Sequence, residues 1–309
     1  MDRKRELRKD EIVMGAIKWL KTKWSVEDIQ KWNSIRKVLY VLLVLLIYSL
    51  LQDIIELLVW YFTDLAAGAL GDDVIAFLGV HSETVTGIVY GIASILALLP
   101  FKGLIQDEIT SVIKRQNEEK SSLFQKAERY VWLAFLALGA SFCLNFLMSF
   151  LKVTENSQSY QSVANAQYGV TFWVGLFLYG VVSPITEEII YRGVTYNRLK
   201  RTFGRIPGIL ISAVLFGCFH GNMVQAVYGT LMGILLAWCY EKYEGFLAPV
   251  LVHVVANLGI YTVTYGNRLT GISYKMRLLG ACISGCITLV CFLYIQKKIL
   301  KEKCRKQVL

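Results

Sequence analysis

The sequence has only three histidines, and its seven cysteines contain no Cys-x-x-Cys pair. Six of the seven cysteines fall within apolar runs, where a thiol behaves as a small hydrophobic side chain. The pattern therefore predicts neither a disulfide framework nor a cysteine-based metal site.

Other familiar patterns are missing as well. No period of roughly 20 to 50 residues repeats convincingly, so neither a solenoid nor a duplicated transporter is supported. No nucleic-acid-binding module is recognisable, so we expect no nucleic-acid partner. A cleavable signal peptide is not expected, because the first apolar run follows roughly forty mostly polar residues and is too long for one.

Apolar residues, in contrast, are abundant. Hydrophobic residues make up 55% of the 309-residue chain, and the mean hydropathy is +0.47, more than a soluble core requires. The sequence predicts an all-α polytopic transmembrane helical bundle with about eight crossings. The apolar runs cover roughly residues 38–62, 86–101, 130–151, 169–190, 207–220, 223–240, 246–264 and 277–296.

Lysine and arginine are concentrated at both ends of the chain and in alternate connections between the runs. This distribution predicts a multi-pass protein of the cell membrane with both termini in the cytoplasm, although Arg268, Lys275 and Arg277 fall on the predicted outer side. The formal net charge of +10 fits this bias and an attraction to anionic membrane lipids, which are the expected lipid partners.

Three regions are expected. Residues 1–37 form a cytoplasmic segment in which Val13, Ile17, Leu20 and Trp24 recur at helical spacing, as in an amphipathic helix lying on the membrane surface. Ser25 and Asp28 have the spacing of a capping box, which predicts that a second short helix starts there. Residues 38–299 form the transmembrane domain, and residues 300–309 form a basic cytoplasmic tail.

Ionisable and amide side chains are concentrated in the later apolar runs, where each one is costly unless it is paired or faces a wet cavity. They are Glu187, Glu188, Arg192, His220, His253 and Asn257. The basic connection around Gly204 predicts an antiparallel helix pair that places Glu187 and His220 at matching heights, roughly 25 Å from the turn. His253 and Asn257 are four residues apart and share a helix face.

Glu188 and Arg192 are also four residues apart, which favours a structural ion pair within one helical turn. Glu187 is rotated about 100° from Glu188 and is free to face another partner. The alternative interpretation of these polar residues is a buried network that only holds helices together, as occurs in membrane proteins.

These residues occur in three motifs, EExxxR from Glu187 to Arg192, FxxxH from Phe216 to His220, and HxxxN from His253 to Asn257. In order and spacing they resemble the signatures of the CPBP family (CAAX protease and bacteriocin-processing, Abi-type), which includes the type II CAAX prenyl endopeptidases. The resemblance covers roughly residues 169–264 and leaves the first half of the chain unmatched. Phe216 is expected to pack in the core beside the site.

The resemblance implies an intramembrane endopeptidase. By position, Glu187 and His220 would hold and activate a water molecule, while His253 and Asn257 would donate hydrogen bonds to the oxyanion. Whether a metal takes part stays open: Glu187, His220 and His253 are plausible ligands of a divalent metal such as zinc, but HExxH spacing is absent. We favour a mechanism with no obligatory cofactor.

The expected substrate is a membrane-associated peptide or a lipidated protein. The alternative function is a non-catalytic membrane binding factor, such as a bacteriocin self-immunity or scaffold protein, and a transporter that uses Glu187 and the histidines as a proton relay is a third. A bacterial source is expected. The sequence does not choose a particular substrate, a cleavage site or an oligomeric state.

Overall fold

A computed structural model describes residues 15, 18, 19, 22, 24–118, 123–266 and 271–308, without the side chains of 115–118, 123–126 and 299–308. Most of the predicted amphipathic segment before residue 24 lies outside the described residues. All regular secondary structure in the described part of the chain is helical, as the sequence predicts.

The helices follow one another with short connections. In chain order they are α2 (Val26–Gln30), α3 (Ser34–Leu70), α4 (Asp72–Val80), α5 (Ser82–Leu96), η1 (Leu99–Phe101), α6 (Lys102–Glu118), α7 (Leu123–Phe150), α8 (Gln158–Gly169), α9 (Phe172–Phe177), η2 (Leu178–Val182), α10 (Ser183–Glu188), η3 (Ile189–Tyr196), α11 (Asn197–Phe203), α12 (Arg205–Cys218), α13 (Met223–Tyr243), α14 (Leu247–Thr264) and α15 (Tyr274–Val308).

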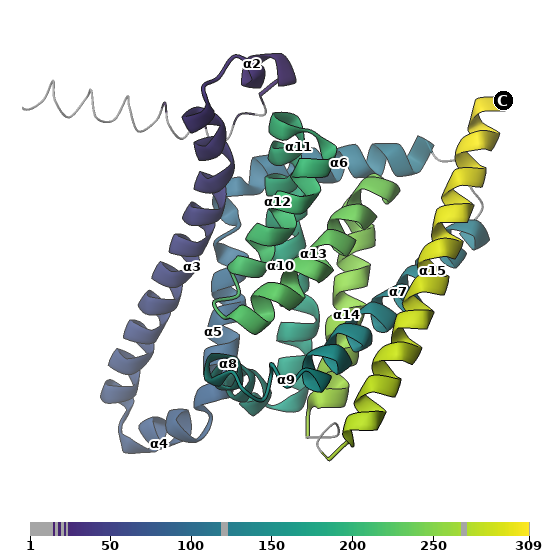
Figure 1. Ribbon diagram of the computed structural model, residues 1–309. Helices are drawn as coiled ribbons and strands as arrows, with labels where there is room; N and C mark the ends of the chain where they lie inside the picture. Colours follow the sequence, from purple (N-terminus) through teal and green to yellow (C-terminus); the bar gives the residue numbers. More distant parts are fainter. Residues whose placement is uncertain are drawn as a thin grey trace, which may run out of the picture.

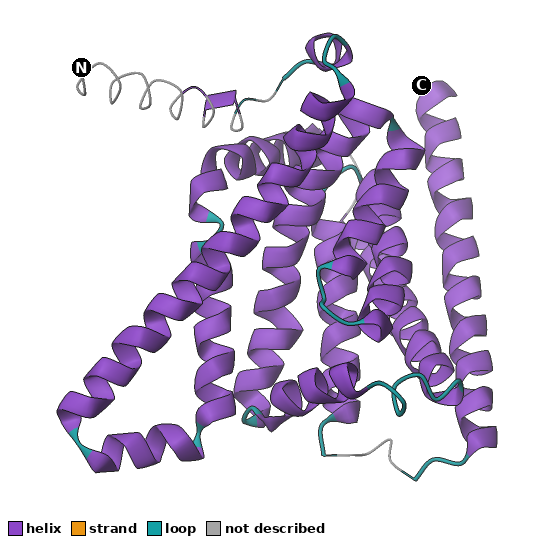
Figure 2. Ribbon diagram, turned by 60° about the vertical axis from the view of Figure 1, so that its left-hand side comes forward, coloured by secondary structure: helices purple, strands orange, loops and turns teal. Residues whose placement is uncertain are grey.

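Most of the long helices run between two ends of the bundle. In Figure 1, α2, α6, α11 and the C-terminal end of α15 lie at one end, whereas α4 and α8 lie at the other. Figure 2 shows the same arrangement after rotation, with α4 and α8 closing the end opposite the C-terminus. By length and composition, seven helical stretches of the described chain could cross a membrane.

The eighth predicted crossing, 207–220, forms the shorter helix α12. It has 14 residues, which gives a length of about 21 Å, less than the roughly 30 Å hydrocarbon core of a bilayer. The predicted turn before it is present at Gly204, which has a φ of +89° and ends α11. Glycine adopts such a positive φ without steric strain.

Helix α12 packs closely against α13. A Cβ atom at Gly217 would lie 2.3 Å from the carbonyl oxygen of Ala226 and 2.9 Å from the backbone nitrogen of Thr230. Small residues are what allow membrane helices to approach this closely. The contact fixes the end of α12, where the FxxxH motif lies.

Helix α2 begins at the residue that the sequence predicts as its cap. Ser25 caps α2, and its hydroxyl oxygen accepts a hydrogen bond of 3.1 Å from the backbone N–H of Asp28. The predicted start of a short helix at Ser25 is therefore confirmed, and Trp32, just after this helix, makes an edge contact with Tyr40 of α3.

The hydrophobic core lies around the middle of α7, η3, α13 and α14. Leu133, Ile190, Leu236 and Val252 are fully buried there. In contrast, α3 exposes many large apolar side chains, including Leu57 at 71%, as expected of a helix that faces lipid. The buried core therefore surrounds the segment that carries the predicted motifs.

Candidate active site

The first motif lies on a continuous helical segment, from α9 to α11, that contains two stretches of π-helix. Ser183 donates its backbone N–H to the carbonyl of Leu178, five residues earlier. The next donor in this pattern would be residue 184, which is proline and has no N–H. The carbonyl of Tyr179 is therefore left without a partner within its helix.

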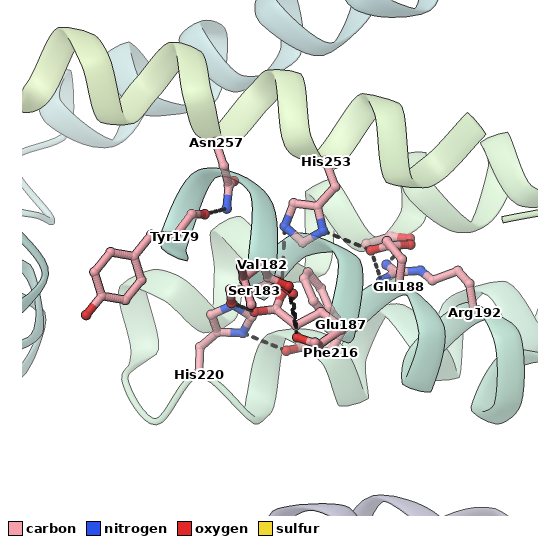
Figure 3. Close-up of polar contacts among 12 residues, drawn as sticks. Tyr179, Val182, Ser183, Glu187, Glu188, Arg192, Phe216, His220, His253 and Asn257 are labelled. Carbon is pink, nitrogen blue, oxygen red and sulfur yellow. Dashed lines mark hydrogen bonds and ion pairs between the residues drawn. The ribbon is translucent and has the colours of Figure 1, made fainter. Parts of the chain in front are cut away.

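The side chain of Asn257 forms a hydrogen bond with this carbonyl. Its Nδ2 atom donates a hydrogen bond of 3.0 Å to the oxygen of Tyr179 (Figure 3). A primary amide has two N–H groups, so the contact orients Asn257 and leaves one donor available.

Glu188 and Arg192 form the predicted ion pair. Nη1 of Arg192 donates to Oε1 of Glu188 at 2.7 Å, and both side chains are completely buried. Arg192 also donates to the carbonyl of Gly233 at 3.2 Å, and its guanidinium carbon lies 4.5 Å from the centre of the Phe216 ring. These contacts hold the buried charge in one position.

His253 lies between the two glutamates (Figure 3). Its Nδ1 atom lies 2.9 Å from Oε1 of Glu188, and its Nε2 atom lies 3.7 Å from Oε2 of Glu187. An ionised carboxylate only accepts hydrogen bonds, so Nδ1 carries the hydrogen. The sequence did not predict the link to Glu188, which aims Nε2 of His253 at Glu187.

Glu187 has a different environment from its neighbour, as its rotation on the helix predicts. Its side chain is 19% exposed, and Oε1 accepts a hydrogen bond from the hydroxyl of Ser183. Since Oε1 is occupied, Oε2 is the oxygen that faces His253. Ser183 belongs to none of the three motifs, although its spacing of four residues from Glu187 was a usable signal.

His220 lies just after α12, in the short connection to α13. Its Nδ1 atom is 2.8 Å from the carbonyl oxygen of Phe216. A carbonyl can only accept, so Nδ1 carries the hydrogen and Nε2 keeps its lone pair. No hydrogen bond joins His220 to Glu187 in the described structure, so the predicted meeting of these residues is not a direct bond.

The ring of Phe216 connects the three motifs. Its centre lies 4.9 Å from the ring of His220 and 5.6 Å from that of His253, both edge-on, and the guanidinium of Arg192 lies over its face. Phe216 is itself buried. It is a packing residue, as expected, and it brings side chains from η3, α12 and α14 around one point.

The predicted alternative metal ligands do not form a metal-binding set. Among the described side chains, no group of three or more His, Cys, Asp or Glu residues is arranged to hold a metal ion. Nδ1 of His220 bonds to a carbonyl and Nδ1 of His253 bonds to Glu188, so a metal would have only the two Nε2 atoms and Oε2 of Glu187 as ligands.

Comparisons with known proteins agree with the motifs. Residues 169–259 match the family described as type II CAAX prenyl endopeptidase Rce1-like. A Bacillus subtilis protein, YdiL, which is named as a candidate membrane peptidase, is 26% identical over 105 residues. The UPF0177 protein YxdF from Lactococcus lactis is 21% identical over 135 residues.

These similarities cover only parts of the proteins. The match to YdiL spans 34% of this chain and 42% of that protein, and the match to YxdF spans 42% of this chain and 75% of its relative. No solved structure matches significantly. The resemblance expected from the motifs is confirmed for residues 169–259, which contain Glu187, His220, His253 and Asn257.

Proposed function

We propose that the protein is an intramembrane endopeptidase that hydrolyses a peptide bond in a membrane-associated peptide or lipidated protein. The observation that carries the proposal is the placement of Glu187, whose free Oε2 faces Nε2 of His253 across 3.7 Å. This distance is too long for a direct hydrogen bond. A reacting group can therefore bind to both atoms at once. The family match over residues 169–259 supports the same class of reaction.

In the proposed reaction, a water molecule is held between Oε2 of Glu187 and Nε2 of His220. Both atoms can accept a hydrogen bond from water, because Nδ1 of His220 is the protonated nitrogen. Glu187 takes a proton as the water oxygen bonds to the peptide carbon. The proton then passes to the leaving amine as the carbon–nitrogen bond breaks.

The net charge of these side chains favours His253 as a hydrogen-bond donor to the oxyanion. The ionised side chains of Glu187 and Glu188 with the guanidinium of Arg192 sum to one negative charge, and a second proton on His253 would cancel it. His253 would then donate from Nε2 to the oxyanion, because Nδ1 is held by Glu188. The free N–H of Asn257, one turn along the same helix, is the second donor.

The test is cleavage by the purified full-length chain in lipid vesicles. A library of peptides from membrane proteins, including farnesylated peptides with a CAAX ending, is incubated with the chain, and new peptide ends are identified by mass spectrometry. We expect Glu187→Gln, His220→Ala and His253→Ala to lower cleavage by on the order of 10²–10⁴-fold. The matched control is Glu27→Gln at an exposed position on α2, which should cleave normally.

Two outcomes would contradict the proposal. Full cleavage by all three site variants would remove these residues from the chemistry. Absence of any cleavage by the unmodified chain across the library would favour the alternative function, a membrane factor that acts by binding.

A further inference from the structure

The side chain of Asn257 is held by a carbonyl on another helical segment, so the packing of the two segments decides where its free N–H points. The carbonyl belongs to Tyr179 in η2, and Asn257 lies on α14. The two N–H groups of a primary amide share one nitrogen, so the bond made by one fixes the direction of the other. A shift of η2 along α14 would therefore turn the free N–H away from the reacting carbonyl.

Two glycines allow α9 and η2 to lie directly on α14. A Cβ atom at Gly180 in η2 would lie 2.5 Å from Cδ2 of Leu258. A Cβ atom at Gly175 in α9 would overlap the hydroxyl of Tyr261 and lie 2.7 Å from its Cζ atom. Small residues of this kind are what allow membrane helices to approach each other closely.

The π-helical geometry of η2 helps both glycines to reach the same helix. Gly175 and Gly180 are five residues apart, and in a regular α-helix they would point about 140° away from each other. Hydrogen bonds in a π-helix join residues five apart, so the wider turn brings the two positions closer to one face. On α14, Leu258 and Tyr261 are three residues apart, and Asn257 lies four residues before Tyr261. These spacings place all three side chains on neighbouring parts of the helix surface.

Tyr261 connects the glycine contacts to the site. It is buried, and its ring stacks on that of Tyr179, with the ring centres 6.3 Å apart. Tyr179 therefore meets α14 twice, through its ring at Tyr261 and through its carbonyl at Asn257. The ring of Tyr261 also lies 5.3 Å from that of Tyr168 on α8. Tyr261 follows the residues that match the family, 169–259, and belongs to no motif.

We infer that Gly175, Gly180 and Tyr261 are positioning residues, which fix α9 and η2 on α14. They thereby aim the free N–H of Asn257 at the oxyanion. In Figure 3 the ring of Tyr179 points away from the other labelled side chains, so these residues act through the backbone of η2 and not on the substrate. The inference rests on the proposed function, because it explains how the proposed oxyanion donor is held.

The experiment uses solid-state NMR of the full-length chain in lipid bilayers. Tyrosine carries an NMR-active carbon isotope at its carbonyl, asparagine carries an NMR-active nitrogen isotope at its side-chain amide, and the dipolar coupling between the two labels is measured. The hydrogen bond of 3.0 Å places the carbonyl carbon of Tyr179 within about 4.2 Å of Nδ2 of Asn257. Loss of this coupling in Asn257→Ala assigns it to the pair.

Gly175→Ala should weaken the coupling, because the added methyl group pushes η2 away from α14. Tyr261→Phe removes the overlapping hydroxyl, so the coupling should recover in part when the two changes are combined. Gly180→Ala should weaken the coupling by less, because the side chain of Leu258 can move aside. It serves as the test variant if Gly175→Ala does not fold.

The matched control is Gly139→Ala on α7. A Cβ atom at Gly139 would lie 3.0 Å from the backbone nitrogen of Thr288 on α15. This contact between helices is also close, but it does not involve η2 or α14. The coupling between Tyr179 and Asn257 should therefore stay unchanged.

Cleavage gives a second readout. Gly175→Ala should lower kcat by about 10²-fold, the cost of a misplacement of about 1 Å, and should leave KM unchanged. In the Asn257→Ala background it should cause no further loss, because both changes remove the same donor. Gly139→Ala should cleave at the normal rate.

Three results would overturn the inference: no coupling in the unmodified chain, an unchanged coupling in both Gly175→Ala and Gly180→Ala, or a loss of kcat in Gly175→Ala that persists in full in the Asn257→Ala background. The spectra need no substrate, so they test the inference even if the chain cleaves none of the peptides. Cleavage that is lost in Glu187→Gln but normal in Gly175→Ala would reject the inference and retain the proposed function.

Discussion

The two halves of the bundle place polar groups in very different surroundings. In residues 169–264, Glu188 and Arg192 are completely buried and His253 is 6% exposed, and each has a specific partner. On α3, Asp53 is exposed, and Glu56 is only half-buried beside Gln52. The difference indicates that precise geometry is required in the second half, where desolvated charges are most expensive.

The halves also differ in helix geometry. Helix α3 is regular over 37 residues, whereas the segment that carries the first motif contains the π-helical stretches η2 and η3 on either side of α10. Single π-turns often occur at functional sites. Here they free the carbonyl that orients Asn257 and flank the turn that holds both glutamates.

The largest expected effect is a difference in stability between two variants, each of which removes one charge from one of the halves. Arg192→Met leaves Glu188 buried without its cation and should destabilise the fold by about 3–5 kcal/mol. Asp53→Asn, on an exposed face of α3, should change stability by about 0.5 kcal/mol or less. Thermal unfolding of the purified chain in detergent measures both. Equal losses would mean that the two halves bury charge in the same way.

The next largest effect is expected on the rate of the proposed cleavage and not on folding. Asn257→Ala removes the proposed oxyanion donor and should lower turnover by about 10²–10³-fold while the protein still reaches the membrane. Asn145→Ala is the matched control, because Asn145 lies on α7 and donates to the carbonyl of Ser141 on the same helix at 2.9 Å. The measurement is the cleavage rate of each variant. A normal rate in Asn257→Ala would exclude Asn257 as an oxyanion donor.

A smaller effect is expected where α12 meets α13. Gly217→Ala places a methyl group against the backbone of α13 and should lower stability by about 1–3 kcal/mol, since backbone atoms cannot move aside as a side chain can. Gly193→Ala is the control, with its nearest atom at 4.0 Å. A melting temperature that is the same for both variants would show that the close contact is unimportant.

The smallest effect should have the opposite sign. Gly68 on α3 has no atom within 4 Å of a Cβ position, so Gly68→Ala meets no obstacle and restricts the unfolded chain. We expect a gain of about 0.5–1 kcal/mol. If thermal unfolding instead shows a loss comparable to that of Gly217→Ala, α3 is packed more tightly than its exposed surface indicates.

Much of the site could be predicted because its signals are local. Spacing along the chain identified the ion pair of Glu188 with Arg192, the turn at Gly204 and the common face of His253 and Asn257. A separation of four residues and a glycine between basic residues have direct geometric consequences. The helical class followed in the same way from the apolar runs.

The rest depends on tertiary contacts or on irregular helix geometry. The bond from His253 to Glu188 requires the rotation of two separate helices, and apolar periodicity does not reveal a π-helical stretch. The absence of a direct bond between His220 and Glu187 likewise could not be derived from matching heights.

The shortness of α12 has a consequence for the surrounding lipid. With 14 residues and a length of about 21 Å, the helix is too short to cross a hydrocarbon core of roughly 30 Å by itself. Local thinning of the bilayer or entry of solvent relieves this mismatch. The rate of the proposed cleavage should therefore depend on the acyl-chain length of the surrounding lipid.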